Sequence, residues 1–184
     1  DRYSNAIGET VWMRWKGGKS LIEHMYGQTL EEDSRYLNDW MQLRGDGILF
    51  WEWPNEIVAV DGNKITLKKP LRLDIRQEWQ VMMGPPFVGR VEGVGVEHLT
   101  LQCPEHEERP HLKDAGYNGV FYEWVLHSWV RNVRFVNMDN ALMTERGTNN
   151  TFRDLHFTGM ECHHASSYRL HSHDNMMEYF LVDN

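Results

Sequence analysis

The stretch Val130-Arg131-Asn132-Val133-Arg134-Phe135 carries the pattern that decides the fold of this chain. Apolar residues alternate with polar ones in it, and residues 96–101, 152–157 and 176–181 repeat the same order. The first residues of these four segments are 34, 22 and 24 positions apart along the chain. Spacings in the low twenties are typical of one coil of a β-solenoid. A charged, turn-rich insertion at residues 104–118 explains the longer first spacing.

Stacking these coils predicts two columns of inward apolar side chains, because strands that pair in register place equivalent residues above one another. A second strand precedes each repeat, at residues 120–125, 142–146 and 168–171, and polar corners join the two. We therefore expect an all-β fold, in which residues 91–184 are a fragment of a right-handed parallel β-helix. The first predicted column is Leu99, Val133, Leu155 and Tyr179, and the second is Leu101, Phe135, Phe157 and Leu181.

The sequence of residues 1–90 predicts a segment of a strand, a helix and a hairpin. We expect this segment to be packed on or inserted into the β-helix, as part of one continuous domain. Residues 10–15 alternate like a strand, and Thr29 is a suitable N-cap for a helix that runs to about Leu43. Residues 56–60 and 64–67 flank Asp61-Gly62-Asn63, which is a strong hairpin signal.

Composition excludes some classes of function. The net charge of −8, without a run of Lys or Arg, argues against nucleic acid, whose binding depends on neutralising phosphates. No stretch approaches the roughly 18 apolar residues of a membrane span. Cys103 and Cys162 are compatible with a disulfide or with free thiols. A polar start without Met and an end directly after an apolar run predict a fragment, whose partner would be the remaining coils of a longer chain.

Several segments together resemble the pectate lyase-like superfamily of right-handed parallel β-helix proteins, in an uncharacterised branch of it. The resemblance covers roughly residues 55–184 and implies a secreted or extracellular enzyme that cleaves polysaccharides by lyase or hydrolase chemistry. The clustered Asp residues that hold calcium in typical pectate lyases are not visible here. No cofactor is predicted, and a divalent cation such as calcium stays an open alternative. The segments that carry the resemblance are residues 63–67, 70–72 with Trp79, 94–100, 129–133, 163–165 and 173–175.

A first candidate site is a column of charged residues on the second strands. Glu123 and Glu145 are one coil apart, and Arg169 follows one coil later. Two neighbouring carboxylates are the groups that a glycoside hydrolase needs. The alternative is a solvated ladder of charges that Arg146 and Arg169 neutralise.

A second candidate site is a group of histidines near the same arginines. A lyase needs a base that removes the proton beside a uronate carboxylate, and a cation that neutralises this carboxylate. A histidine or tyrosine base with an arginine as the neutralising cation meets this need. His164 and His171 are candidate bases, with Arg146 and Arg169 as neutralising cations, and Tyr168 is a possible proton donor. A metal site is not predicted, since neighbouring residues on a strand point to opposite faces and this would separate His163 from His164.

Other side chains are candidates for binding substrate. The predicted coils place Tyr122, Thr144 and Tyr168 in one column, and His127, Asn149 and His173 in a corner column. Loops inserted into such folds often carry binding residues, so Lys113 in the insertion is a further candidate. The predicted substrate-binding residues are Lys113, Tyr122, His127, Tyr168 and His173.

These patterns favour a carbohydrate-active enzyme that cleaves a polysaccharide in a groove along the β-helix, with a lyase slightly preferred. Two alternatives stay open. One is a retaining or inverting glycoside hydrolase that uses Glu123 and Glu145. The other is a structural or adhesive β-helix segment without catalytic activity, since a fold alone does not determine function.

Overall fold

The computed structural model contains two compact units, residues 1–88 and residues 89–184, and each is described here by itself. Most described residues lie in strands, so the predicted all-β class is confirmed. The structure describes residues 3, 5–31, 50–86, 89–105, 107, 110, 113, 115–160 and 163–183.

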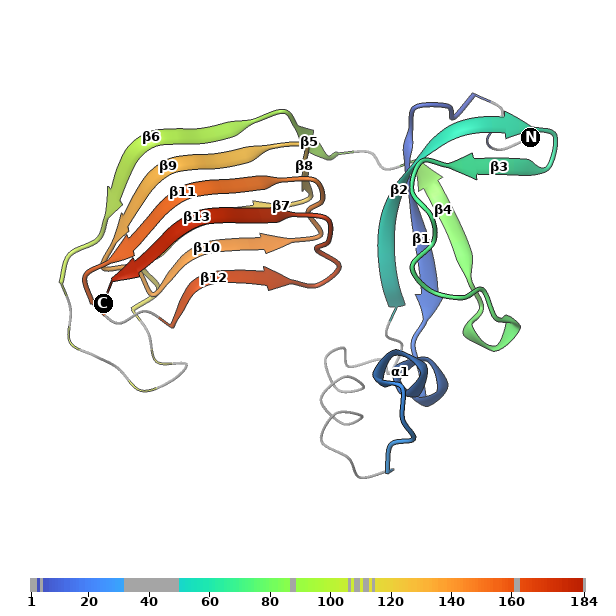
Figure 1. The fold of residues 1–184 in the computed structure, drawn as a ribbon, viewed down its shortest axis with the longest axis horizontal. Coiled ribbons are helices and arrows are strands. Elements are labelled where there is room, and N and C mark those ends of the chain that lie inside the picture. Colours follow the sequence, from blue (N-terminus) through green and yellow to red (C-terminus); the bar gives the residue numbers. More distant parts are fainter. Residues whose placement is uncertain are drawn as a thin grey trace. The chain divides into compact units, whose positions relative to one another are not determined.

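The first unit is built on an antiparallel sheet of four strands in the order β3-β2-β1-β4 (Figure 1). The predicted hairpin is confirmed, because Asp61 pairs with Lys64 and Gly62 has the positive φ of +55° that this tight turn requires. Tryptophans form the core of the unit, and Trp15 donates its ring N–H to the backbone carbonyl of Asp74. The strands are β1 (Thr10–Lys16), β2 (Phe50–Asp61), β3 (Lys64–Leu67) and β4 (Met82–Pro86), with a 3-10 turn η1 at Gln77–Trp79.

The helix of this unit was not predicted. Helix α1 (Lys19–Tyr26) buries Leu21 and Ile22 completely and ends at Gly27, whose φ is +69°. Its N-cap is Gly18, which offers no side chain to cap the helix, so the usual sequence signal for a helix start is missing. The helix that was predicted from Thr29 is absent at residues 29–31, and its remainder lies outside the described residues.

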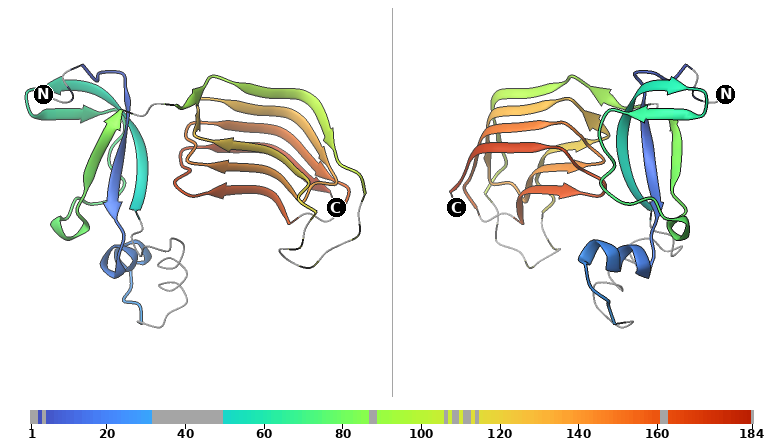
Figure 2. Two further views of the ribbon diagram at one scale, coloured as in Figure 1. Left: turned by 180° about the vertical axis from the view of Figure 1, so that it is seen from behind. Right: turned by 45° about the vertical axis from the view of Figure 1, so that its right-hand side comes forward.

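The second unit consists mainly of two parallel sheets, between which the chain alternates (Figures 1 and 2). The order of strands in the larger sheet is β13-β11-β9-β6, and in the smaller sheet it is β12-β10-β7. The short strands β5 (Val91–Glu92) and β8 (Val125–Leu126) pair in parallel and form a separate sheet of two strands. The larger sheet contains β6 (Gly95–Gln102), β9 (Trp129–Val136), β11 (Thr151–Thr158) and β13 (Met176–Asp183), and the smaller one β7 (Asn118–Glu123), β10 (Asn140–Glu145) and β12 (His164–Arg169).

Each passage of the chain through the two sheets is called a coil below. The core between these sheets follows the predicted columns over three coils. Leu99, Val133 and Leu155 are in register, and so are Leu101, Phe135 and Phe157. The rings of Phe135 and Phe157 stack with their centroids 5.2 Å apart and their planes within 8°. The columns that the repeat spacing predicts thus bury Val133, Leu155, Phe135 and Phe157, whereas Leu99 is 38% exposed.

The prediction was wrong for the fourth coil. Leu155 pairs with Phe180 and Phe157 with Val182, so Tyr179 and Leu181 do not continue the predicted columns. The physical reason is one extra residue in the corner at residues 170–172. Glu145 pairs with Arg169, 24 positions on, but Thr148 forms its bridge with His173, 25 positions on. Because side chains alternate with a period of two, a shift of one residue moves the whole inward set to the other face.

The same shift corrects the predicted corner column. His173 lies in the row of Leu126 and Thr148, and not in the row of His127 and Asn149. The residue that shares a left-handed conformation with His127 and Asn149 is Asp174, with φ values of +50°, +58° and +53°. The second strands also begin and end earlier than predicted, as β7, β10 and β12 do.

Buried polar side chains connect successive coils at another corner. The backbone N–H of Val94 donates to the hydroxyl of Ser128, whose own N–H donates to the side-chain oxygen of Asn150. The N–H of Asn150 donates in turn to the side-chain oxygen of Asn175. The amide of Asn150 also donates to the carbonyl of Val125. Four coils therefore share a continuous hydrogen-bonded stack, which satisfies backbone groups that the corner removes from the sheets.

Candidate functional site

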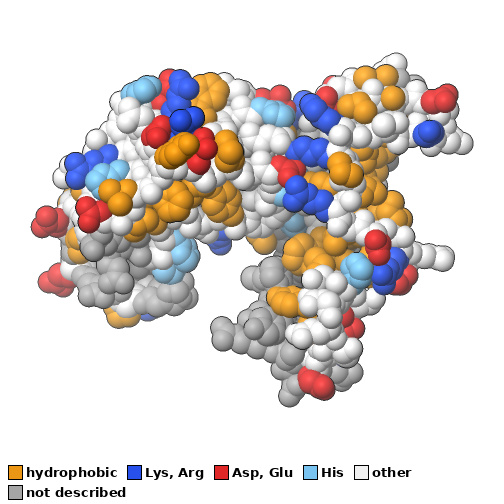
Figure 3. Space-filling view, in the orientation of Figure 1, with side chains coloured by type: hydrophobic (Ala, Val, Ile, Leu, Met, Phe, Trp, Pro, Cys, Tyr) orange, Lys and Arg blue, Asp and Glu red, His pale blue; other side chains and the backbone are white. Residues whose placement is uncertain are grey.

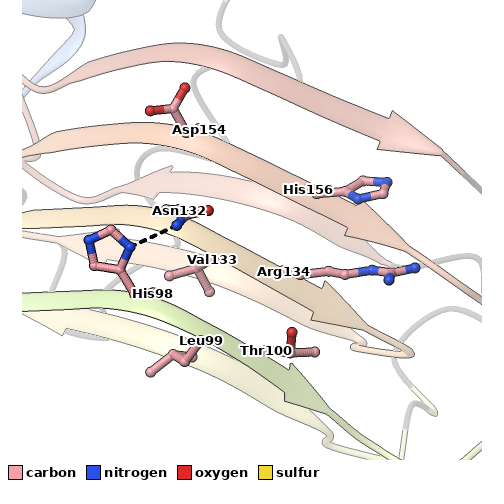
Figure 4. Close-up of a pocket in the computed structure, with 8 residues that line it drawn as sticks. All are labelled: His98, Leu99, Thr100, Asn132, Val133, Arg134, Asp154 and His156. Carbon is pink, nitrogen blue, oxygen red and sulfur yellow. Dashed lines mark hydrogen bonds between the residues drawn. The ribbon is translucent and has the colours of Figure 1, made fainter.

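A shallow hollow of about 480 Å³ lies on the outer face of the larger sheet of the second unit. Polar side chains from β6, β9 and β11 line it in two columns, with Leu99 and Val133 between them (Figure 4). Figure 3 shows charged and histidine side chains gathered over this sheet. One column is His98, Asn132 and Asp154, and the other is Thr100, Arg134 and His156.

A repeated backbone kink creates the first column. His98, Asn132 and Asp154 have φ values of +56°, +51° and +53°, and each falls between two residues that pair regularly across the sheet. Asn and Asp tolerate this left-handed conformation well, because their short polar side chains bond locally. The kink interrupts the alternation of the strand. As a result, two consecutive residues are exposed directly before the inward column, Arg131 and Asn132 before Val133, and Arg153 and Asp154 before Leu155.

The hollow brings one guanidinium, two imidazoles and one carboxylate onto three adjacent strands. The side-chain amide of Asn132 lies 2.7 Å from Nδ1 of His98, and donation by this amide leaves Nε2 as the protonated nitrogen of a neutral ring. Arg134 and His156 are register partners, so their backbones are about 4.8 Å apart. Arg134 is exposed and forms no ion pair with any residue that the structure describes.

A ladder of paired charges borders the hollow. Arg131 forms an ion pair with Glu97, and Nη1 of Arg153 lies 3.5 Å from the carboxylate of Glu178. The hydrogen bond from Arg131, followed by that from the Trp129 ring, lowers the pKa of Glu97. These arginines are therefore neutralised within the ladder, whereas the charge of Arg134 is available to a ligand.

The predicted column of acids is present on the outer face of the smaller sheet. Glu145 is in register with both Glu123 and Arg169. Nη1 of Arg146 forms an ion pair with Glu145 and lies 3.3 Å from Oε1 of Glu123, and its guanidinium lies 5.0 Å from the centre of the Trp124 ring. One arginine thus holds both carboxylates. This arrangement resembles the alternative given above, a ladder of charges that arginines neutralise.

The predicted group of histidines is divided in the structure. His164 begins β12 and Arg169 ends it, so they are about 16 Å apart along the strand. His171 and His173 lie near the Arg169 end, in the corner that carries the extra residue, and Nδ1 of His173 is 2.9 Å from the carboxylate of Asp174. The structure therefore separates the candidate base His164 from its predicted neutralising cation.

The expectation that His163 and His164 point to opposite faces was also wrong. Their rings stack with centroids 4.2 Å apart. The reason is that His163 precedes β12, so the alternation of a strand does not apply to it. Among the residues that the structure describes, no group of three or more His, Cys, Asp or Glu side chains is arranged to hold a metal ion.

Tyr122 is a core residue, and its prediction as a substrate-binding residue was wrong. The side chain is only 5% exposed, and its hydroxyl donates to the carbonyl of Trp129 at 2.7 Å. Burial raises the pKa of this phenol. Positions 120 and 122 of β7 point inward, whereas Glu123 next to them is exposed.

Tyr122→Phe tests this structural role. We expect the free energy of unfolding to fall by about 1–2 kcal/mol, because the variant leaves the buried carbonyl of Trp129 without its donor. Denaturant unfolding measures the change, and binding of any glycan should be unaffected. An unchanged midpoint of unfolding together with weaker glycan binding would contradict the assignment.

Tyr168 lies in the same column on the edge strand β12. Its ring meets Phe152 edge-on at 5.8 Å, and burial raises the pKa of Tyr168 to about 12. The phenol therefore keeps its proton at neutral pH and is unsuited to act as a base.

The raised pKa of Tyr168 predicts a pH effect on stability. The folded state favours the neutral phenol, so its contribution is present below the ordinary pKa of 10 and is lost as the pH rises through about 12. A difference titration of the wild type against Tyr168→Phe, followed by phenolate absorbance, should show the midpoint near 12. A midpoint near 10 would show that the ring is not buried in this way.

The remaining predicted residues lie apart from the hollow. His127 is exposed at a corner, and Lys113 is exposed in the insertion, which the structure describes only in part. Cys162 lies outside the described residues, and Sγ of Cys103 is 3.5 Å from Sδ of Met138. No helix in the part of the chain that the structure describes has the length and apolar character to cross a membrane.

The comparisons with known proteins add no assignment. No protein-family model matches this chain, and no curated protein or solved structure matches it. Function is therefore argued from the geometry of the site.

The sequence contained a signal for the hollow that the prediction did not use. Thr100, Arg134 and His156 are separated by 34 and 22 residues, the spacings that placed the core columns correctly. The same spacings relate His98, Asn132 and Asp154. Applying the repeat to the polar positions of the strands as well as to the apolar ones would have found both columns.

Proposed function

We propose that residues 89–184 form coils of a right-handed parallel β-helix of the pectate lyase-like kind. The support for this proposal is the regular return of the chain to two parallel sheets, together with the hydrogen-bonded stack that links four coils at one corner. The hollow would then lie on the outer surface of the β-helix, where a long polymer has access to it.

We further propose that the hollow is the active site of a secreted enzyme that cleaves a uronate-containing polysaccharide by β-elimination. The observation that carries this proposal is the side-by-side position of Arg134 and His156 on adjacent strands of the hollow. A guanidinium matches a carboxylate in shape and charge, so Arg134 would bind the uronate group.

The chemistry assigns a role to each group. Arg134 neutralises the substrate carboxylate, which makes the proton on the neighbouring carbon more acidic. The neutral imidazole of His156 takes this proton, and the electrons of the C–H bond form a carbon–carbon double bond. The bond from the next ring carbon to the glycosidic oxygen breaks, and the leaving oxygen takes up a proton. His98, which Asn132 orients through Nδ1, presents its Nε2–H as a donor for that step.

Elimination fits the hollow better than hydrolysis does. A glycoside hydrolase needs two carboxyl groups on either side of the scissile bond. Asp154 is the one carboxylate among the residues that line the hollow, and that of Asp183, 3.9 Å from Nε2 of His156, is engaged with this ring. The pair Glu123 and Glu145 on the other sheet is held by Arg146.

The test is incubation of the protein with a panel of uronate polysaccharides, in which ultraviolet absorbance and reducing ends are followed together. Elimination predicts that both signals rise in parallel, because each cleavage creates one unsaturated product. Release of reducing ends without absorbance would indicate hydrolysis instead. Binding without either signal would indicate an adhesive or structural segment.

A further inference from the structure

Tyr179 continues one wall of the hollow onto the neighbouring strand. Glu178 pairs with Arg153 and Phe180 pairs with Leu155, so Tyr179 occupies the position next to Asp154. Its φ of +51° is that of the same kink. The column of His98, Asn132 and Asp154 therefore extends to an aromatic residue on β13.

The backbone conformation of Tyr179 is unusual for a bulky residue. A bulky side chain in the left-handed region is strained, and strain of this kind clusters at functional sites. Tyr179 is 68% exposed, so burial in the core does not compensate for this strain.

Arg153 holds the ring of Tyr179 in place. Its guanidinium carbon lies 5.0 Å from the ring centroid, and its nitrogens lie 3.3 Å from the carboxylate of Asp154 and 3.5 Å from that of Glu178. Two carboxylates thus fix the arginine, and the arginine fixes the ring through a cation–π contact. The ring is connected to the hollow through Asp154.

We propose that Tyr179 is a stacking platform for a sugar ring of the polysaccharide, at the β13 side of the hollow. This inference rests on the proposed function, and it adds a binding site that the cleavage chemistry does not require. The negative face of an aromatic ring attracts the C–H groups on the apolar face of a pyranose. Because adjacent strands are about 4.8 Å apart, a glycan that occupies both the hollow and Tyr179 must run across the strands of the sheet.

The test measures the affinity of di- and hexasaccharides of galacturonate, glucuronate and mannuronate by calorimetry, in a His156→Gln background that prevents turnover. Tyr179→Asn removes the ring but suits the left-handed backbone, as Asn132 does in the same column. We expect it to weaken binding of the hexasaccharide about tenfold and to leave the disaccharide unchanged. Tyr179→Phe keeps the ring and should bind as tightly as the background protein.

Phe121→Ala is the matched control, because Phe121 is 47% exposed on the smaller sheet and should not affect binding. If hexasaccharides bind and Tyr179→Asn binds them equally well, the stacking platform is wrong while the proposed function stands. A loss of affinity in Phe121→Ala instead would place the glycan on the other sheet and overturn the platform. If no uronate oligosaccharide binds at all, the proposed function fails and the platform fails with it.

Discussion

Asn150→Ala is expected to lower the free energy of unfolding by about 2–4 kcal/mol, because Asn150 is the central member of the buried corner stack. The side chain is 1% exposed, accepts a hydrogen bond from the N–H of Ser128 and donates one to the carbonyl of Val125. The alanine variant leaves the N–H of Ser128 buried without a partner, and it leaves the carbonyl of Val125 with the N–H of Thr148 alone. A buried unpaired N–H costs about 1–3 kcal/mol, and the lost second hydrogen bond and the cavity add to the loss.

Asn118→Ala is the matched control for this experiment. The side-chain oxygen of Asn118 also accepts an amide hydrogen bond, from Asn140, but the pair is exposed and water can replace it. Its loss should stay within about 0.5 kcal/mol. Denaturant unfolding, followed by far-ultraviolet circular dichroism, compares the two variants. Equal losses would show that the corner stack does not stabilise the coils in the way proposed.

Arg134→Gln is expected to lower kcat/KM for the uronate polysaccharide by about 10²–10³, since removal of one electrostatic stabiliser typically has an effect of this size. His156→Gln should lower kcat by about 10²–10⁴ and affect KM less, because a general base acts in the chemical step. Initial rates of ultraviolet absorbance measure both effects. The difference between the two variants separates binding of the carboxylate from removal of the proton.

Arg169→Gln provides the control for this second experiment. Arg169 is an exposed arginine on the smaller sheet, so its removal changes the net charge by the same amount. Rates within about twofold of the wild type are expected, because exposed charges far from a site act weakly at physiological salt. If Arg169→Gln is as damaging as Arg134→Gln, the reaction takes place on the smaller sheet and the assignment of the hollow is wrong.

The register of β13 shows how far the repeat could be extended from sequence. Residues 176–182 are apolar at every position except Glu178, so the local pattern fits either face. The spacing from β11 to β13 then depends on the length of a corner, which has no periodic pattern of its own. The pairing of β13 with β11 resolves the ambiguity, because it places Phe180 beside Leu155 and Val182 beside Phe157.

The candidate site was less predictable than the core for a related reason. The sequence drew attention to histidines that are close along the chain, but His164 begins β12 and His171 lies beyond the other end of this strand. His98, Arg134 and His156 are far apart in sequence, and the stacking of coils brings them onto three adjacent strands. Proximity along the chain is therefore a poor guide to proximity across a parallel sheet.

The sequence alone determined the strand class, the hairpin at Asp61-Gly62 and the shared columns of Val133 with Leu155 and of Phe135 with Phe157. These features follow from alternation and turn chemistry, which are properties of consecutive residues and of a regular spacing. Only the tertiary structure decided the register of the last coil, the burial of Tyr122 and the left-handed kinks beside the hollow. Each of these depends on how a corner of irregular length or a kinked strand is packed against its neighbours, and local sequence preferences do not contain that information.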